Sequence, residues 1–350
     1  MNTSAIRLTL ARLFARPLPD VETTARRVSP ASFQYNDTNA THRMATGFYT
    51  HPDCVRHEMG EWHPECPERL RAIEDQLIAG RIDGLLERRE APAADESSLR
   101  LVHTQDHIDF IRDNIPETGY FPIDPDTLLN PYSWRAATRA AGAAVAATDA
   151  VIRGELDNAF CSVRPPGHHA TPTRAMGFCL FNNVAIAAAH ALEVHGLSRV
   201  AIVDFDVHHG NGTEAAFAND DRVLMCGIFQ HPFYPFSGAD HPAPNMLNIP
   251  LSARTSGMAA REAIDYGWLG QLDAFRPEMI FFSAGFDAHR EDDLGNLGLT
   301  EADFTWMTER VKAIADRHAK GRIVSCLEGG YNLSALGRSV VAHLKVLADV

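Results

Sequence analysis

The feature that most constrains the fold of this chain is a regular alternation of two sequence patterns. Short, continuous apolar runs alternate with longer, often Ala-rich segments of helical periodicity. This alternation is typical of right-handed βαβ units, in which short strands are buried on both faces. The predicted strands are 159–163, 200–205, 223–228, 279–283 and 323–327, and the predicted helices are 134–153, 183–195, 258–275 and 301–318. We therefore predict a single α/β domain with an open, mainly parallel sheet and helices on both faces.

Polar and ionisable residues gather where the predicted strands end. RPPGHH follows strand 159–163, DFDVHH begins as strand 200–205 ends, and GFD and EGGY follow strands 279–283 and 323–327. The carboxyl ends of parallel strands lie along one edge of an open sheet, where such folds place their sites. We therefore expect these segments to meet in one crevice.

A metal site is the first chemistry that these residues suggest. Side chains two positions apart on an extended segment point the same way, so Asp204, Asp206 and His208 share one face. Asp206 and His208 can bind one cation, with Asp287 arriving from another strand. Two carboxylates and one imidazole leave positions open for water and substrate, as in catalytic zinc sites. Zn²⁺ is therefore expected first, and Fe²⁺ is the alternative that these ligands do not exclude.

An isolated Asp-x-His is more often a strand-end cap beside a buried histidine than a metal site. Here, however, acids and histidines recur at several strand ends. Burying so many ionisable groups without a metal or other partners would be costly. The repeated pattern therefore favours the metal.

The adjacent His168 and His169 follow a Pro-Pro-Gly turn that would fix the directions of their side chains. Histidine titrates near neutral pH, so one imidazole could take a proton from water and one could protonate a leaving amine. Asp204 and Asn211 are the candidate orienting partners. Tyr331 follows two glycines that allow close backbone approach, and its phenol could donate a hydrogen bond to an oxyanion.

Composition narrows the class of protein. A formal net charge of −13 over 350 residues argues against a mainly electrostatic nucleic-acid binder. The sequence has no apolar run of about twenty residues, so no membrane span is expected. The six cysteines lack CxxC spacing and are interpreted as reduced thiols of a cytoplasmic protein. Residues 1–45 are interpreted as a flexible extension rather than a targeting peptide, which leaves 46–350 as the catalytic domain.

Together, RPPGHHA, GFCLFNN, VDFDVHHGNGT, SAGFDAHRED and LEGGYNL resemble the histone deacetylase superfamily, which includes acetylpolyamine amidohydrolases and acetoin-utilisation proteins. The resemblance runs from about Gly47 to the C-terminus and includes HPECPERL near His63. The motifs are long, ordered and mutually spaced, which makes the match highly specific. GNG and EGGY resemble the class II branch. The resemblance implies the three-layer αβα fold shared by arginases and deacetylases.

The resemblance also implies roles for the site residues. It implies one zinc per chain on Asp206, His208 and Asp287. His169 would be the general base and acid, with His168 as its electrostatic partner. In the same way, Tyr331 would polarise the acetyl carbonyl.

A narrow substrate tunnel is a further implication. Phe178 and Tyr234 would be its aromatic walls, beside Gly177, and they suit the apolar stem of a lysine or polyamine. Leu294 stands where polyamine-selective relatives carry a gatekeeper glutamate. An apolar gate does not attract a second ammonium group, so acetyl-lysine or another monoacylated amine ranks above acetylpolyamine.

This chain differs from the family's usual sequence at the potassium site. The resemblance places potassium behind the zinc, on Asp204, Asp206 and His208. Relatives usually carry Ser-Leu-His or Ser-Ile-His after this strand, where this chain has Gly227, Ile228 and Phe229. The missing hydroxyl implies a site that is weaker or completed by backbone and water.

The sequence therefore predicts a metal-dependent deacetylase that removes an acetyl or short acyl group from an amine such as acyl-lysine, using metal-activated water. The alternatives are an acetylpolyamine or other small-amide amidohydrolase and a non-catalytic acyl-amine binding protein. An arginase-like ureohydrolase with two manganese ions is disfavoured because Gly210 stands where its second metal needs a carboxylate. The expected partner is the acetylated amine, without nucleic acid or membrane, and a homo-oligomer is left open.

Overall fold

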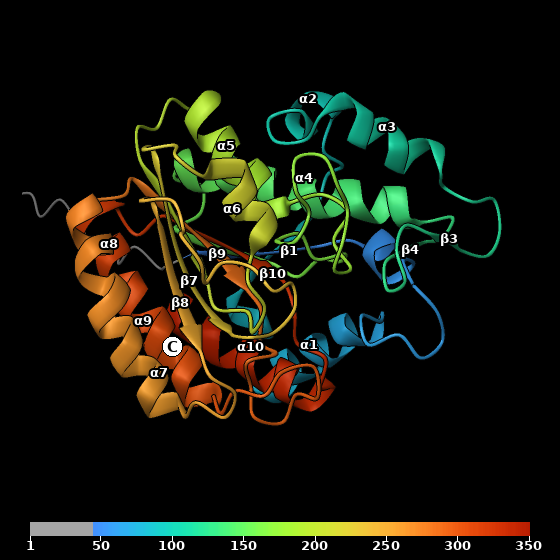
Figure 1. Cartoon of the computed structure of the whole chain (residues 1–350). Coiled ribbons are helices and arrows are strands. Elements are labelled where there is room, and N and C mark those ends of the chain that lie inside the picture. The colour runs from blue at the N-terminus through green and yellow to red at the C-terminus, as the bar shows by residue number, and fades with distance from the viewer. Residues whose placement is uncertain (1–44) are drawn as a thin grey trace, which may run out of the picture. The chain divides into compact units, whose positions relative to one another are not determined.

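An eight-stranded sheet organises the described part of the chain, residues 45–350 of a computed structural model (Figure 1). The strand order is β2-β1-β5-β10-β9-β6-β7-β8, and all neighbouring pairs are parallel. The strands are β1 (Thr46–Thr50), β2 (Glu87–Glu90), β5 (Asn158–Cys161), β6 (Val200–Asp204), β7 (Val223–Gln230), β8 (Met246–Leu251), β9 (Met279–Ala284) and β10 (Ile323–Leu327). A separate antiparallel pair joins β3 (Phe121–Pro122) to β4 (Leu128–Leu129).

Helices cover both faces of this sheet (Figure 1). On one face α4 (Ser133–Ile152) packs against β5 and β10, and α5 (Asn183–Glu193) packs against β6 and β9. The helices of the other face are α1 (Glu68–Ala79), α7 (Gly257–Ile264), α8 (Gly270–Phe275), α9 (Glu301–His318) and α10 (Leu333–Leu347). The shorter α2 (Glu96–Leu99), α3 (Gln105–Asp113) and α6 (Asn211–Phe217) lie on the α4 and α5 side. The predicted α/β architecture with a parallel sheet is confirmed.

The predicted elements are all present, although some boundaries differ. The helix predicted over 258–275 is divided by a π-helical turn, Asp265–Leu269, between α7 and α8. The prediction did not include the interior strand β1 or the edge strands β2 and β8, because their sequences TGFYT, ERRE and MLNIPL are not continuously apolar. Such charged or Pro-containing strands are typical of sheet edges. The flexible extension predicted for residues 1–45 falls almost wholly on residues 1–44, which lie outside the described part.

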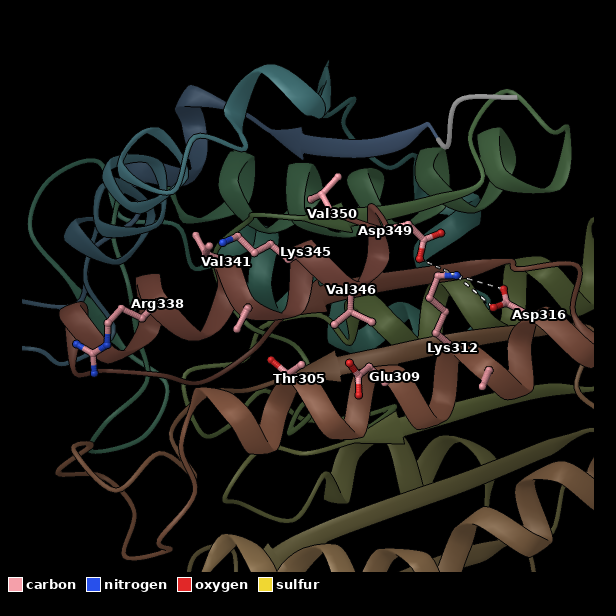
Figure 2. Close-up of a pocket in the computed structure, with 12 residues that line it drawn as sticks. Thr305, Glu309, Lys312, Asp316, Arg338, Val341, Lys345, Val346, Asp349 and Val350 are labelled. Atoms are coloured by element: carbon pink, nitrogen blue, oxygen red, sulfur yellow. Dashed lines mark hydrogen bonds and ion pairs between the residues drawn. The ribbon is translucent and has the colours of Figure 1, made fainter. Parts of the chain in front are cut away.

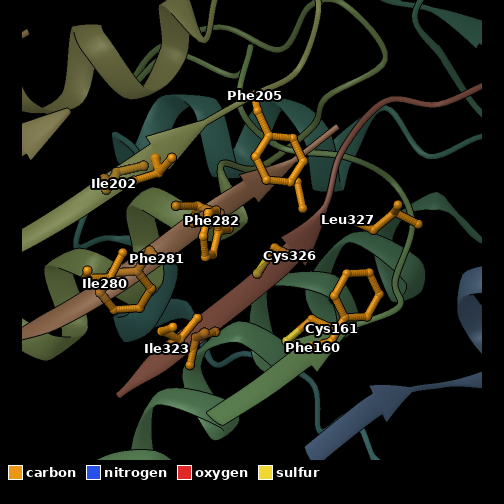
Figure 3. Close-up of a cluster of buried hydrophobic side chains, with 14 of the residues drawn as sticks. Phe160, Cys161, Ile202, Phe205, Ile280, Phe281, Phe282, Ile323, Cys326 and Leu327 are labelled. Atoms are coloured by element: carbon orange, nitrogen blue, oxygen red, sulfur yellow. The ribbon is translucent and has the colours of Figure 1, made fainter. Parts of the chain in front are cut away.

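The central strands carry the apolar core (Figure 3). Phe160, Ile202, Phe282 and Ile323 are completely buried, and the ring of Phe282 lies 5.6 Å from that of Phe205. None of the six cysteines forms a disulfide, which agrees with their interpretation as reduced thiols. This packed platform positions the loops at the carboxyl ends of its strands.

A groove on the outer surface of α9 and α10 is separate from those loops (Figure 2). Nζ of Lys312 lies there, 3.1 Å from Oδ2 of Asp316 and 3.3 Å from Oδ1 of Asp349. None of the predicted site residues lines this groove. No helix in residues 45–350 combines the length and apolar character needed to cross a membrane.

Candidate active site

Four neighbouring strands position the candidate site. The order β5-β10-β9-β6 places the segments that follow these strands side by side at the carboxyl edge of the sheet. The register pairs Asp204 with Ser283, and Leu327 with Ala284, so β6, β9 and β10 end at the same level. The motifs predicted to meet are therefore brought into one region.

The three predicted metal ligands converge there. Nδ1 of His208 lies 3.0 Å from Oδ1 of Asp206 and 3.2 Å from Oδ2 of Asp287. The remaining carboxylate oxygens are fixed by the backbone, because Oδ2 of Asp206 accepts the N–H of Gly329 and Oδ1 of Asp287 accepts the N–H of Val207, both at 2.8 Å. Oδ2 of Asp287, Nδ1 of His208 and Oδ1 of Asp206, which also accepts the backbone N–H of His208 at 2.9 Å, are the atoms placed to bind an ion.

The electrostatics of this set fit a divalent cation. Oδ2 of Asp287 is buried and accepts no hydrogen bond. Burial and the negative charge of Asp206 raise the pKa of Asp287 to about 7. Burial lowers the pKa of His208, but the adjacent carboxylates of Asp206 and Asp287 outweigh that effect and raise it to about 10. Two buried carboxylates that repel each other would be stabilised by a shared cation.

Two glycines make room for these carboxylates. A Cβ on Gly285 would lie 1.9 Å from Oδ2 of Asp206, and one on Gly329 would lie 2.0 Å from Oδ2 of Asp287. No side chain fits at such distances. The glycines of the GFD and EGGY motifs therefore allow the backbone to enclose the metal set.

The His-His pair has two different orienting partners. Nδ1 of His168 lies 2.9 Å from Oδ2 of Asp204, and Nδ1 of His169 lies 2.7 Å from Oδ1 of Asn211. The two rings are 4.1 Å apart, and the ring of His169 lies 5.8 Å from that of His208. The structure thus pairs one imidazole with a carboxylate and the other with a neutral amide.

The surroundings of the two imidazoles shift their pKa values in opposite directions. Burial disfavours the charge of His168, but the carboxylates of Asp206 and Asp204 outweigh burial and raise its pKa well above the usual value. Burial, followed by the charges of His168 and His208, lowers the pKa of His169 well below the usual value. A protonated His168 and a neutral His169 follow from this arrangement.

Tyr331 lies among three other side chains at the site. Its ring contacts that of Phe178 edge to face at 5.8 Å, and the Arg69 guanidinium lies 4.9 Å from its centroid. Burial raises the pKa of Tyr331, so the phenol keeps its proton. Asp292 accepts the backbone N–H of Tyr331 at 2.6 Å and that of Leu294 at 3.0 Å. Leu294, the predicted gate residue, is therefore held next to the loop that carries Tyr331.

The other predicted tunnel residues lie against the histidines. The ring of Tyr234 contacts that of His169 edge to face at 5.2 Å. Gly177 has a φ of +57°, and a Cβ there would lie 2.5 Å from Cδ2 of His169 and 3.0 Å from the Tyr234 hydroxyl. Phe178 also contacts His63, with ring centroids 4.7 Å apart. The GF pair of GFCLFNN therefore lines the approach to His169.

A buried ion triad beneath the site was not predicted. Nη1 of Arg69 lies 3.0 Å from Oε1 of Glu65, and Nη2 of Arg164 lies 2.6 Å from Oε2 of the same carboxylate. Arg69 also donates to the carbonyls of Glu328 and Gly330, the latter at 2.7 Å. The triad joins the RPPGHH and EGGY segments. HPECPERL contains two of its members, but spacing alone does not identify partners so distant in sequence.

Glu328 supports the His-His turn in a similar way. Its Oε2 accepts the backbone N–H of Gly167 at 2.6 Å and that of His168 at 3.1 Å. Burial raises the pKa of Glu328 to about 7. Glu328 and Asp292 both stand within quoted motifs, but only their contacts reveal that they position the loops.

Replacing Glu65 by glutamine is expected to destabilise the protein by about 3–5 kcal/mol, because two buried guanidinium groups lose their shared carboxylate. Burial alone raises the pKa of Glu65, but Arg164 and Arg69 outweigh it and lower the pKa to about 2. The stabilisation is therefore complete above the unfolded-state pKa and is lost as the pH falls towards 2. Urea denaturation at pH 7 and pH 3 measures both effects.

Arg222→Ala is the control for this variant. Arg222 forms an exposed pair with Glu193, and its loss should cost no more than about 1 kcal/mol. Equal losses in the two variants would contradict the stabilising role of the triad.

The fold agrees with comparisons to known proteins. The family model of the histone deacetylase domain matches residues 63–347. A histone deacetylase-like amidohydrolase of Pseudomonas aeruginosa is 38% identical over 295 residues, covering 82% of this chain and 77% of that protein. A probable deacetylase of Archaeoglobus fulgidus is 37% identical over 301 residues, covering 83% and 82%. The crystal structure of the HDA15 HD domain superposes with a TM-score of 0.82 at 36% identity, covering 87% of this chain and 90% of that one.

These matches span the strands and loops that build the site, and they support a deacetylase or amidohydrolase activity with an acetylated amine as substrate. The sequence-based resemblance is confirmed. This chain belongs to the histone deacetylase domain family.

Proposed function

We propose that this protein is a zinc-dependent deacetylase that hydrolyses the amide of an acetylated or short-acylated amine such as acyl-lysine. The observation that carries the proposal is the convergence of Asp206, His208 and Asp287 beside a neutral, amide-paired His169. Fe²⁺ is the alternative ion, because carboxylate and imidazole ligands also suit it. One ion is proposed for this crevice.

Each residue of the site has a separate role in the proposed reaction. A bound divalent ion would polarise the acyl carbonyl and lower the pKa of water at this position. His169, neutral beside Asn211, accepts the proton of the attacking water and returns it to the departing amine. His168, held protonated by Asp204, contributes positive charge beside the developing oxyanion. Tyr331 donates a hydrogen bond to that oxyanion.

The direct test is a fluorogenic acyl-lysine assay on protein stripped with a chelator and reloaded with zinc. The proposal expects activity that is absent from the stripped protein and restored by zinc. A folded, zinc-loaded protein without turnover on any acyl amine would favour the non-catalytic binding protein. Two ions in the crevice would favour the ureohydrolase, but a Cβ on Gly210 would already lie 2.4 Å from Oδ2 of Asp204.

Acetyl-lysine peptides are expected to be better substrates than acetylputrescine or acetylspermidine. The half-buried Leu294 gives the tunnel an apolar gate, without the charge that would attract a second ammonium group. The comparison of kcat/KM across these substrates tests this preference. Higher values for the polyamines would instead support the small-amide alternative.

Replacing Tyr331 by phenylalanine is expected to lower kcat by about 10²–10³-fold with little change in KM, because one oxyanion donor is removed. The contacts of the ring with Phe178 and Arg69 do not involve the hydroxyl, so the fold should be retained. Steady-state kinetics and circular dichroism measure the two properties. An unchanged kcat would remove the hydroxyl from the mechanism.

A potassium site is also part of this proposal. Potassium would bind near Asp204, Asp206 and His208 without a hydroxyl from residue 227. A Cβ on Gly227 would meet only Oδ1 of Asn248, at 3.7 Å, so water has room to take the place of the hydroxyl. The class II character, the cytoplasmic location and the open question of a homo-oligomer stay predictions from the sequence.

A further inference from the structure

A second cluster of metal-binding side chains lies at the opposite edge of the sheet. Nε2 of His190 and Nε2 of His195 lie 2.7 Å and 2.6 Å from the same oxygen, Oδ1 of Asp149. The two imidazole rings are 5.1 Å apart at an interplanar angle of 78°. We infer that Asp149, His190 and His195 form a second site for a divalent transition metal, independent of the proposed deacetylase reaction.

The backbone holds these three side chains together from two helices. Asp149 lies in the last turn of α4, and His190 lies in the last turn of α5, which packs along it. The chain then turns back, with the N–H of His195 donating to the carbonyl of His190 at 3.3 Å and Gly196 at a φ of +68°. The helix ends at Glu193, and the left-handed Gly196 turns the chain directly after His195, whose ring lies beside that of His190.

The location separates this cluster from the catalytic region. Val200 begins β6 five residues after His195, whereas Asp204 ends that strand at the catalytic edge. A five-residue strand spans about 16 Å at ~3.3 Å per residue. The second cluster therefore cannot supply ligands to the ion proposed for Asp206 and Asp287.

The donor set defines the class of ligand. Two imidazoles and one carboxylate suit Zn²⁺, Ni²⁺ or Cu²⁺ better than Mg²⁺ or Ca²⁺. The side chains of His190, His195 and Asp149 are 10%, 21% and 30% exposed, so water can reach the remaining positions. Tetrahedral ligands lie about 3.3 Å apart, so the two distances from Nε2 to Oδ1 of Asp149 need to lengthen by less than about 1 Å. The proposed catalytic set shows a similar contraction, with atoms 3.0 Å and 3.2 Å apart.

The charges near the cluster are compatible with a cation. Oδ1 of Asp149 contacts both imidazoles, and its carboxylate supplies the negative charge of the cluster. Nη1 of Arg153 approaches Oδ2 of Asp149 at 3.6 Å, but its Nε is bound to Glu155 at 2.6 Å. A bound ion would join the ends of α4 and α5 as a structural link.

Zinc stoichiometry of the full chain tests this site. Protein stripped with a chelator, equilibrated with zinc chloride and freed of excess by gel filtration should hold about two zinc ions per chain. His195→Gln should hold about one, because the amide keeps an N–H donor for Asp149 but is a poor zinc ligand. A His195→Gln variant with the wild-type zinc content would overturn the inference, and the three side chains would then be only a hydrogen-bonded group.

Two further variants separate this result from the catalytic site. Asp287→Asn should retain about one zinc ion, and the double variant with His195→Gln should retain none. Zinc should raise the Tm of Asp287→Asn and leave that of the double variant unchanged. His318→Ala is the matched control, because Nε2 of His318 contacts Asp273 at 2.9 Å without a second ligating imidazole at that site. Loss of zinc from this control would show that the binding is unspecific.

Discussion

Replacing Asp287 by asparagine is expected to remove the catalytic ion and lower kcat/KM on an acyl-lysine substrate by at least about 10³-fold. A catalytic metal contributes several kcal/mol to transition-state stabilisation, and each ~1.4 kcal/mol corresponds to a factor of ten. Oδ2 of Asp287 is the buried atom without a hydrogen bond in the metal set, so no other group at the site compensates for its loss. Activity and zinc content measured in the His195→Gln background isolate the catalytic ion.

The same variant, although less active, should be more stable than wild type at pH 8 when both proteins are metal-free. Burial and Asp206 raise the pKa of Asp287 to about 7, above its unfolded value. Its stabilising contribution is therefore complete below the unfolded-state pKa and is lost as the pH rises through about 7. In Asp287→Asn this loss is absent, so the stripped variant should be more stable than stripped wild type at pH 8. Urea denaturation at pH 5 and pH 8 measures the difference.

Either of two results would contradict this account. A zinc content in the Asp287→Asn, His195→Gln double variant equal to that of His195→Gln alone would show that Asp287 is not a ligand. A stripped Asp287→Asn protein that is less stable than wild type at pH 8 would show that the two carboxylates do not repel each other in the empty site.

Replacing His169 by alanine is expected to lower kcat by about 10²–10⁴-fold, the usual contribution of a positioned general base. The zinc content should stay unchanged, because His169 is not one of the three predicted ligands. Steady-state kinetics on zinc-loaded protein measure the loss, and His318→Ala serves as a surface histidine control. Wild-type turnover in folded, zinc-loaded His169→Ala would end the assignment.

The Asn211→Asp variant tests whether His169 acts as the general base or has only a structural role. A carboxylate 2.7 Å from Nδ1 of His169 would favour the protonated imidazole and raise its pKa. The base must be neutral, so kcat/KM should fall at neutral pH and recover at higher pH. An acidic limb of the pH profile that does not move would indicate that His169 does not accept the proton.

The alternation of apolar runs and helical segments was sufficient to predict the central part of this fold. Strands buried on both faces must be continuously apolar, so β5, β6, β7, β9 and β10 can be recognised from local sequence. Edge strands carry no such requirement, which is why ERRE in β2 was not recognised. The position of motifs at strand ends also predicted which residues gather, since parallel strands end at a common edge.

Only the tertiary structure decided which groups face one another. The sequence named Asp204 and Asn211 as partners of the histidine pair but could not say which imidazole each would orient. Tertiary packing also separates the two pKa values, because Asp206 and Asp204 raise that of His168 whereas burial lowers that of His169. Likewise, nothing local joins Glu65 to Arg164, or Asp149 to His195. Sequence periodicity records whether a side chain is buried, whereas the contacts between distant side chains depend on how complete elements pack. The candidate ligand set was therefore readable from strand ends, but the ion triad and the second cluster emerged only from the packing of helices and loops.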